Sequence, residues 1–257
     1  YPKHLSLEQC SSEITARYKA RLLQGDSLTD LTGGFGIDCS FLATGFKSTT
    51  YVERQEELCE IAAHNFPVLN LNHINIKNED GVTYLQAMSP VDCLFLDPAR
   101  RNEHGGKTVA ISDCEPNVAE LEELLLQKAN RVMIKLSPML DLSLALKELK
   151  QTQEVHILSV NNECKELLIL LGQTSPAEIS IHCVNLFTKG TQKEQHFVFT
   201  REQEQCSECT YTDSLETYLY EPNASLLKAG AFRSIAAAYP VRKLHPNSHL
   251  YTSDTFI

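Results

Sequence analysis

The stretch LTDLTGGFGID, residues 28–38, decides how the rest of the sequence is interpreted. An apolar segment ends in Asp30, and Gly33, Gly34 and Gly36 follow within six residues. Glycines between a strand and a helix allow a tight turn and a close approach of the main chain to a ligand. The dinucleotide pattern G-x-G-x-x-G fails here, because a pattern begun at Gly34 needs a glycine at position 39, which is a cysteine.

Strand and helix patterns alternate outward from this turn. Short apolar segments that we predict as strands are separated by helical patterns, and they lie at 27–32, 49–53, 74–78, 91–97 and 131–136. Such alternation predicts βαβ crossovers and a parallel sheet covered on both faces. The apolar runs 155–160 and 167–171 are separated by only six residues, too few for a crossover helix, so we expect this last pair to be antiparallel.

Acidic residues recur where the predicted strands end. Glu53 ends the second strand, where a carboxylate can accept hydrogen bonds from both ribose hydroxyls, and Asp80 ends the third at a helix start. Asp80 is equally well explained as a helix N-cap, and Glu53 as an ordinary acid at a helix start. Together with Asp30 they favour a cationic, phosphate-free nucleoside such as S-adenosylmethionine, because a carboxylate repels a pyrophosphate and attracts an ammonium or sulfonium.

The fourth predicted strand runs directly into DPARR, residues 97–101. We expect Asp97 to project from the carboxyl edge of the sheet, Pro98 to stiffen the turn, and Arg100 and Arg101 to hold an anionic substrate. The alternative is a strand-end aspartate that caps its loop, with the arginines on the surface.

Composition limits the possible classes. The net charge is −10, which argues against general nucleic-acid binding, although the stretch from residue 222 to the end is mildly basic. No apolar run approaches the roughly 20 residues of a membrane span, and the first residues lack a signal-peptide core. Nine cysteines, an odd number, indicate reduced thiols and a cytoplasmic setting. Cys206 and Cys209 have C-x-x-C spacing without a second ligand pair, so we expect no metal site.

The segments DLTGGFGID, YVE, EDG and DPARR resemble motifs I to IV of S-adenosylmethionine-dependent class I methyltransferases. Longer segments, such as LSLEQCSSEITARYKA and IKLSPMLDLSLALKEL, resemble a bacterial methyltransferase family of the Bacteroidetes type with a ferredoxin-like insert and a THUMP-like domain. Family members continue beyond such segments, so this chain looks like a piece shortened at both ends.

The resemblance implies a Rossmann-like α/β sheet, parallel with one antiparallel hairpin strand, and a small α+β C-terminal unit. It implies a helical lead-in at 1–25, a methyltransferase domain at 26–175, a ferredoxin-like β unit at 176–210 and part of a THUMP-like domain at 211–257. The donor site expected from these motifs comprises Asp30, Thr32, Gly33, Gly34, Gly36, Glu53, Asp80, Gly81, Asp97 and Pro98. Asp97 and Arg100 are the expected catalytic residues.

THUMP domains are associated with tRNA modification, so the resemblance implies an RNA substrate, tRNA or rRNA. The residues that we expect to contact RNA phosphates are Arg100 and Arg101 beside the site and, in the tail, Lys228, Arg233, Arg242 and Lys243. DPAR lacks the aromatic residue that would stack on a flipped base, so methylation of a base amino group does not follow. Three alternatives stay open, namely a protein methyltransferase, a small-molecule methyltransferase and a non-catalytic RNA-binding protein with a donor pocket. An NAD-dependent oxidoreductase comes last.

Overall fold

A computed structural model describes residues 10–100, 110–174 and 176–257, and the chain divides into two compact units. Unit 1 comprises residues 1–152 and 169–175, and unit 2 comprises 153–168 and 176–257. Among the described residues, no helix has both the length and the apolar character that a membrane crossing demands.

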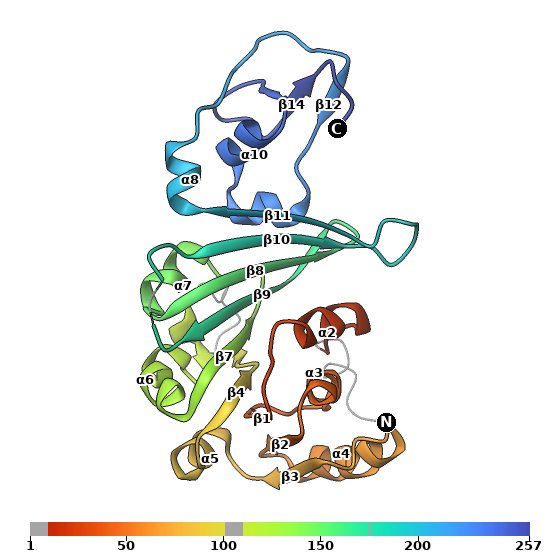
Figure 1. The fold of residues 1–257 in the computed structure, drawn as a ribbon, viewed down its shortest axis with the longest axis vertical. Coiled ribbons are helices and arrows are strands. Elements are labelled where there is room, and N and C mark those ends of the chain that lie inside the picture. Colours follow the sequence, from red (N-terminus) through yellow and green to blue (C-terminus); the bar gives the residue numbers. More distant parts are fainter. Residues whose placement is uncertain (1–9, 101–109, 175) are drawn as a thin grey trace. The chain divides into compact units, whose positions relative to one another are not determined.

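Unit 1 is built on a parallel sheet in the order β7-β4-β1-β2-β3 (Figure 1). Its strands are β1 (Ser27–Asp30), β2 (Ser48–Glu53), β3 (Ile74–Asn78), β4 (Val91–Leu96) and β7 (Ala129–Leu136). Its helices are α2 (Glu13–Ala20), α3 (Ile37–Leu42), α4 (Glu56–Val68), α5 (Gly81–Ala87), α6 (Val118–Lys128) and α7 (Leu142–Glu148). The described part of this unit also contains two 3-10 turns, η1 (Ala43–Gly45) and η2 (Ile111–Asp113), and a small antiparallel pair, β5 (Ala99–Arg100) with β6 (Cys114–Glu115).

The strand order places a topological switch point between β1 and β4. The chain runs from β1 outward through β2 to β3 and then returns to β4 on the other side of β1. In open α/β sheets, ligands bind outside the carboxyl ends of the strands at such a point. The register aligns these ends, because Asp30 pairs with Tyr51 of β2 and with Phe95 of β4.

Core packing holds the glycine turn against the sheet. Tyr51, fully buried in β2, forms a cluster with Cys39 and Ala43 at α3 and with Ala62 and Phe66 of α4. The rings of Tyr51 and Phe66 meet edge to face, with centroids 5.4 Å apart. This cluster fixes α3 and α4, the helices that follow β1 and β2, on the sheet.

Strand β9 (Glu163–Gly172) follows β8 (Thr152–Val160) through a turn of two residues. Asn161 and Asn162 have φ of 48° and 66°, which is the geometry of a tight β-hairpin turn, and β8 and β9 are neighbours in the sheet. Residues 169–172 of β9 belong to unit 1, where β9 adjoins β7. The expected antiparallel hairpin after a parallel sheet is therefore confirmed.

In unit 2, β8 pairs in parallel with β10 (Ser180–Leu186), which forms an antiparallel hairpin with β11 (Glu194–Thr200). A second, antiparallel sheet has the order β12 (Tyr218–Tyr220), β14 (Tyr251–Ser253), β13 (Arg242–Lys243). The helices of unit 2 are α8 (Arg201–Cys206), α9 (Ala224–Ala229) and α10 (Phe232–Ala238). This unit contains the small C-terminal α+β part that the sequence predicts.

Two expected elements differ. The sequence pattern of residues 225–240 predicts one helix, but the structure has two, because Gly230 adopts the left-handed conformation (φ 73°) and ends α9. The polar composition of residues 201–214 predicts a linker, but this stretch begins with α8, whose start is stabilised by a capping box between Thr200 and Gln203.

Candidate active site

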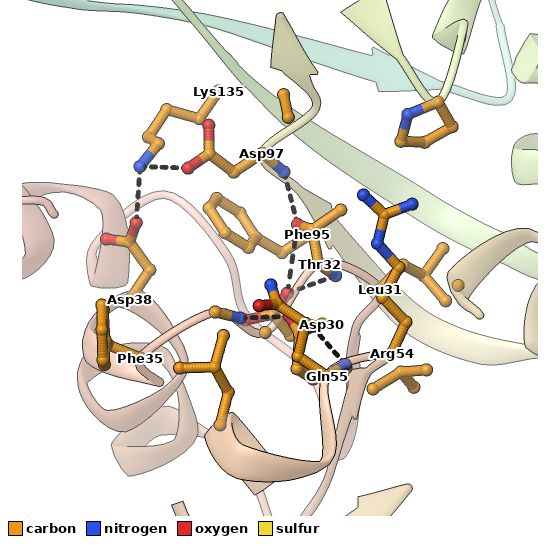
Figure 2. Close-up of a pocket in the computed structure, with 18 of the residues that line it drawn as sticks. Asp30, Leu31, Thr32, Phe35, Asp38, Arg54, Gln55, Phe95, Asp97 and Lys135 are labelled. Carbon is orange, nitrogen blue, oxygen red and sulfur yellow. Dashed lines mark hydrogen bonds and ion pairs between the residues drawn. The ribbon is translucent and has the colours of Figure 1, made fainter. Parts of the chain in front are cut away.

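A pocket of about 310 Å³ opens at the carboxyl ends of β1, β2, β4 and β7 in unit 1 (Figure 2). Most of the predicted donor-site residues line it, namely Asp30, Thr32, Gly33, Gly34, Glu53, Asp80, Gly81 and Asp97. Gly36 and Pro98 are not among its lining residues. The convergence follows from the parallel sheet, whose strand ends all reach one edge.

The glycines of the turn are required by packing and backbone conformation. Gly34 and Gly36 have positive φ, 53° and 73°, which residues with a side chain rarely adopt. A Cβ at Gly33 would lie 2.2 Å from the ring of Tyr51, directly beneath the turn. The hydroxyl of Tyr51 also donates a hydrogen bond to the carbonyl oxygen of Gly34. The turn is therefore held in one shape before any ligand arrives.

Asp30 ends β1 and is only 1% exposed. Its Oδ1 accepts a hydrogen bond from the backbone N–H of Thr32 at 3.0 Å. Burial raises the pKa of Asp30 to about 8, although the Thr32 N–H opposes the rise. The Thr32 hydroxyl in turn accepts a hydrogen bond of 2.6 Å from the backbone N–H of Asp97 (Figure 2). Thr32 thus joins the ends of β1 and β4.

Glu53 ends β2, is 8% exposed, and uses both carboxylate oxygens to hold the main chain. One oxygen accepts the N–H of Gly34 at 2.9 Å, and the other accepts the N–H of Gln55 at 2.8 Å. An ionised carboxylate has about four acceptor positions, so both oxygens can accept further hydrogen bonds from a ligand.

Asp80 caps α5, as the structural alternative predicts. Its Oδ1 accepts hydrogen bonds from the N–H groups of Val82 and Thr83, both at 3.0 Å. Gly81 follows it and packs against the first turn, where a Cβ would lie 2.2 Å from the carbonyl oxygen of Leu31. Asp80 therefore has a structural role, and its position in the pocket lining is compatible with ligand contact as well.

A buried ion-pair network adjoins the pocket, and the sequence analysis missed all of it except Asp97. Lys135, in β7, lies 2.6 Å from Asp97 and 3.1 Å from Asp38 (Figure 2). Lys19 of α2 lies 3.0 Å from Asp38, and the Ser11 hydroxyl donates to Asp38 at 2.8 Å. Lys19 is fully buried and Lys135 is 7% exposed. The network extends from the N-terminal helix to the mouth of the pocket.

Charge pairing sets the ionisation of this network. Burial alone would raise the pKa of Asp38, but Lys19 and Lys135 hold it below its usual value. Burial raises the pKa of Asp97, and Lys135 opposes that rise. Lys135, near the end of the apolar segment RVMIKL, is the one local signal in the sequence that could have revealed the network. The sequence pattern of α2 does not distinguish Lys19 from other helical residues.

The two arginines after Asp97 and the cysteine thiols, which could serve as nucleophiles in another kind of methyl transfer, have different outcomes. Arg101 lies outside the described residues, and of Arg100 only the backbone is described, in β5. Cys93 and Cys114 are buried, and burial raises the pKa of Cys164. Among the described residues that line the pocket, the cysteine is Cys10, and burial raises its pKa as well. Such thiols are poor nucleophiles, because the thiolate is the reactive form.

The basic tail residues do not form an exposed pair. Lys243 is 4% exposed, and its ammonium donates to the carbonyl oxygen of Pro246 at 2.7 Å. Arg242 forms an ion pair with Glu216. The expectation that Lys243 contacts RNA phosphates is therefore wrong, because burial commits its charge to the fold.

Comparisons with known proteins identify a similar domain and similar whole structures. A family model described as a ferredoxin-like domain matches residues 218–257, whereas the sequence analysis expects the ferredoxin-like unit at 176–210. No curated protein matches the chain. A solved structure, described as a "putative methyltransferase from Porphyromonas gingivalis W83", is similar over 100% of this chain at 39% identity, with a TM-score of 0.89. The chain spans 64% of the length of that protein.

More distant structures share the fold. The O-methyltransferase from Bacillus cereus, solved with S-adenosylhomocysteine (SAH), is 13% identical, with a TM-score of 0.50 over 67% of this chain and 92% of that one. A modification subunit of a type I restriction enzyme from Vibrio vulnificus YJ016 is 12% identical, with a TM-score of 0.52 over 79% and 57%. The chain is therefore similar over its whole length to the Porphyromonas protein and shares its fold with these more distant structures.

Proposed function

We propose that the pocket binds S-adenosylmethionine and that the chain transfers the methyl group to an acceptor beside Asp97. The observation that carries this proposal is the convergence of Asp30, the glycine turn, Glu53 and Asp97 on one pocket at the switch point of the sheet. This chain spans 64% of the length of the Porphyromonas protein, so the activity is proposed for a chain that corresponds to part of that protein.

The residues present suit this donor. Asp30 is a buried carboxyl with a pKa of about 8, and a cation bound next to it favours ionisation, because opposite charge lowers a carboxyl pKa. Glu53 keeps acceptor positions for the two hydroxyls of a ribose. The turn after β1 lacks the G-x-G-x-x-G pattern and begins at the carboxyl group of Asp30, which repels a pyrophosphate when ionised, and both features disfavour NAD.

When bound, S-adenosylmethionine supplies an electrophilic methyl group. Asp97 offers a carboxylate oxygen at the mouth of the pocket, where it can accept a hydrogen bond from an N–H or O–H of the acceptor. Lys135, 2.6 Å from that carboxylate, holds it in one orientation. Orientation of the acceptor supplies much of the rate in a displacement of this kind.

For the acceptor we propose RNA, cytoplasmic tRNA or rRNA, on the strength of the motif resemblance. A protein or small-molecule acceptor, or donor binding without catalysis, is the alternative. The burial of Lys243 removes one expected phosphate contact, so RNA binding has to depend on other basic residues. A test of the acceptor therefore has to supply RNA and protein to the enzyme in parallel.

Calorimetry tests the donor. S-adenosylmethionine should bind the chain and NAD should not, and Glu53→Gln should weaken donor binding about 10–100-fold, the scale of a lost charge-assisted hydrogen bond. The matched control is Glu57→Gln, at an exposed carboxylate of α4 outside the pocket lining, which should leave the affinity unchanged. NAD binding, or equal affinities for the two variants, would overturn the assignment.

Labelled methyl transfer to total RNA and, in parallel, to total protein tests the chemistry. We expect label in RNA, and Asp97→Ala should abolish transfer while donor affinity changes little, because Asp97 is assigned to the acceptor. Label in protein alone contradicts the RNA proposal. Donor binding without transfer to either pool favours the non-catalytic alternative.

A further inference from the structure

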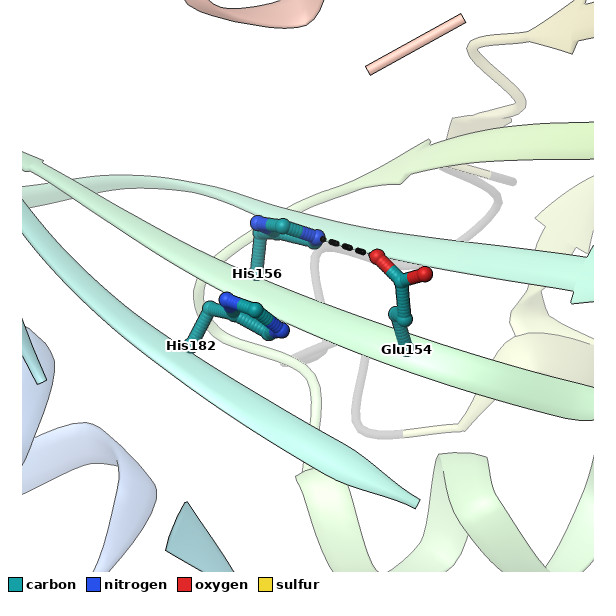
Figure 3. A group of neighbouring side chains, drawn as sticks. All are labelled: Glu154, His156 and His182. Carbon is teal, nitrogen blue, oxygen red and sulfur yellow. Dashed lines mark hydrogen bonds and ion pairs between the residues drawn. The ribbon is translucent and has the colours of Figure 1, made fainter. Parts of the chain in front are cut away.

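Three side chains that can bind metal gather on one face of the sheet in unit 2 (Figure 3). Glu154 and His156 lie two residues apart on β8, so they point to the same face. His182 of β10 is directly opposite His156 in the parallel pairing and therefore shares that face. Nothing in the proposed methyl transfer uses these residues.

The distances are close to those of a metal site. His156 Nε2 lies 3.2 Å from Glu154 Oε2, and the ligand atoms of all three residues lie within 4.8 Å of one another. A tetrahedral zinc ion with bonds of about 2.1 Å holds its ligand atoms about 3.4 Å apart. The glutamate and the first histidine already meet this spacing, and Figure 3 shows both rings beside Glu154.

One rearrangement is needed. The rings of His156 and His182 are stacked, with centroids 4.2 Å apart and planes inclined by 16°. The lone pair of an imidazole nitrogen lies in the ring plane, so two nearly parallel rings cannot both aim at one ion. Rotation about the side-chain bonds of His182 has to tilt its ring toward Glu154.

The surroundings of His182 favour metal binding. Its Nδ1 lies 3.0 Å from Nε2 of His196 on β11, and its Nε2 lies 3.2 Å from the hydroxyl of Ser180. Metal-binding histidines commonly use the second ring nitrogen to donate a hydrogen bond to an orienting partner, which His196 can be.

We propose that Glu154, His156 and His182 bind a divalent transition-metal ion of the zinc class, with water in the fourth position and with His196 orienting His182. Two imidazoles and one carboxylate suit Zn²⁺ and Co²⁺ better than Mg²⁺ or Ca²⁺, which prefer oxygen ligands alone. This site is separate in sequence and chemistry from the C-x-x-C pair, Cys206 and Cys209. The proposal stands or falls independently of the methyl transfer.

Titration with Co²⁺ tests the site, because tetrahedral Co²⁺ absorbs visible light strongly and a thiolate ligand adds a charge-transfer band in the near ultraviolet. The intact chain should carry Cys206→Ser and Cys209→Ser, so that these thiols do not compete. We expect a visible band that saturates at about one ion per chain, disappears on addition of Zn²⁺, and has no thiolate band.

Single variants in that background locate the ligands. His182→Ala and the conservative Glu154→Gln should each abolish the band, and His196→Ala should keep it while weakening Zn²⁺ binding about 10–100-fold, as loss of an orienting partner does. His245→Ala removes an exposed histidine of unit 2 outside the cluster and is the matched control. Circular dichroism should show that all four variants are folded.

Three results would overturn the proposal: no visible band, a thiolate band, or a visible band that survives both His182→Ala and Glu154→Gln in folded protein. In each case the rings of His156, His182 and His196 pack against one another across β8, β10 and β11 without binding an ion.

Discussion

The ends of β1 and β4 each bring an aspartate to the same pocket, and the two carboxyl groups are held in different ways. Asp30 is buried and bound by a backbone N–H, and its pKa rises to about 8. Asp97 keeps 39% of its side chain exposed and forms a 2.6 Å ion pair with Lys135. Burial raises the pKa of both, but only at Asp97 does an adjacent lysine strongly oppose it. The same residue type therefore has a backbone partner in a buried setting at one strand end and a lysine partner at the next.

The largest expected effect on stability is that of Lys135→Met, which removes the charge of the lysine that pairs with Asp97 and keeps most of its side-chain volume. Asp38 and Asp97 would both lose a buried partner, and removal of one member of a buried ion pair costs about 3–5 kcal/mol. Chemical denaturation measures the free energy of unfolding. Lys47→Met, which breaks an exposed pair with Asp26, is the control and should change little. Equal losses in the two variants would mean that the network contributes no more than a surface pair.

Asp30→Asn tests the other strand end and should stabilise the protein. The unfolded chain ionises Asp30 near its ordinary pKa of 3.8, whereas the folded chain keeps the proton until about pH 8. The folded state thus binds more protons between these values, and stability falls as pH rises through that window. At pH 7 the asparagine variant should be more stable by about 2–4 kcal/mol, with no gain at pH 3.

The same variant also reports on the donor. Ionised Asp30 attracts a cation, so donor affinity in the unmodified chain should rise with pH up to about 8 and then level off. In Asp30→Asn this rise should be absent. Calorimetry at several pH values measures the donor affinity of both proteins. The same rise of affinity with pH in Asp30→Asn would exclude Asp30 as its cause.

The smallest expected effect concerns the shape of the β1 end. Gly81→Ala places a Cβ 2.2 Å from the carbonyl oxygen of Leu31, a backbone atom that cannot rotate away. Overpacking of this kind costs about 1–3 kcal/mol and should displace the turn after Asp30, weakening donor binding. A Cβ at Gly45 would have no atom within 4 Å, so Gly45→Ala is the control. Thermal unfolding of the two variants measures the difference in stability. If both glycines tolerate alanine equally, close packing does not hold the turn.

Local patterns predicted most of the sheet. Alternating strands and helices predicted β1 to β4 and β7. The six residues between the apolar runs 155–160 and 167–171 predicted the hairpin of β8 and β9, because so short a connection cannot contain a crossover helix. The helix expected up to Pro240 was wrong at Gly230, where a left-handed glycine outweighs helical periodicity.

The candidate site was predictable only where it depends on strand ends. Asp30, Glu53 and Asp97 reach the pocket because parallel strands end at one edge. The partners of Asp38 are 97 residues away at Lys135 and on a separate helix at Lys19, and pairing over such a separation leaves no periodic signal. The row formed by His156 and His182 was missed for the same reason, because it depends on the register between β8 and β10.

The buried ion-pair network around Asp38 also constrains the order in which parts of the structure can form during synthesis. Ser11 and Lys135, which meet at 3.2 Å, are 124 residues apart, so an emerging chain makes Lys19 and Asp38 long before Lys135 leaves the ribosome. Until β7 joins the sheet, the mouth of the pocket lacks the cation that holds Asp97 in place. A nascent chain that ends before residue 135 therefore lacks most of the fifth parallel strand and the ion pair that holds Asp97.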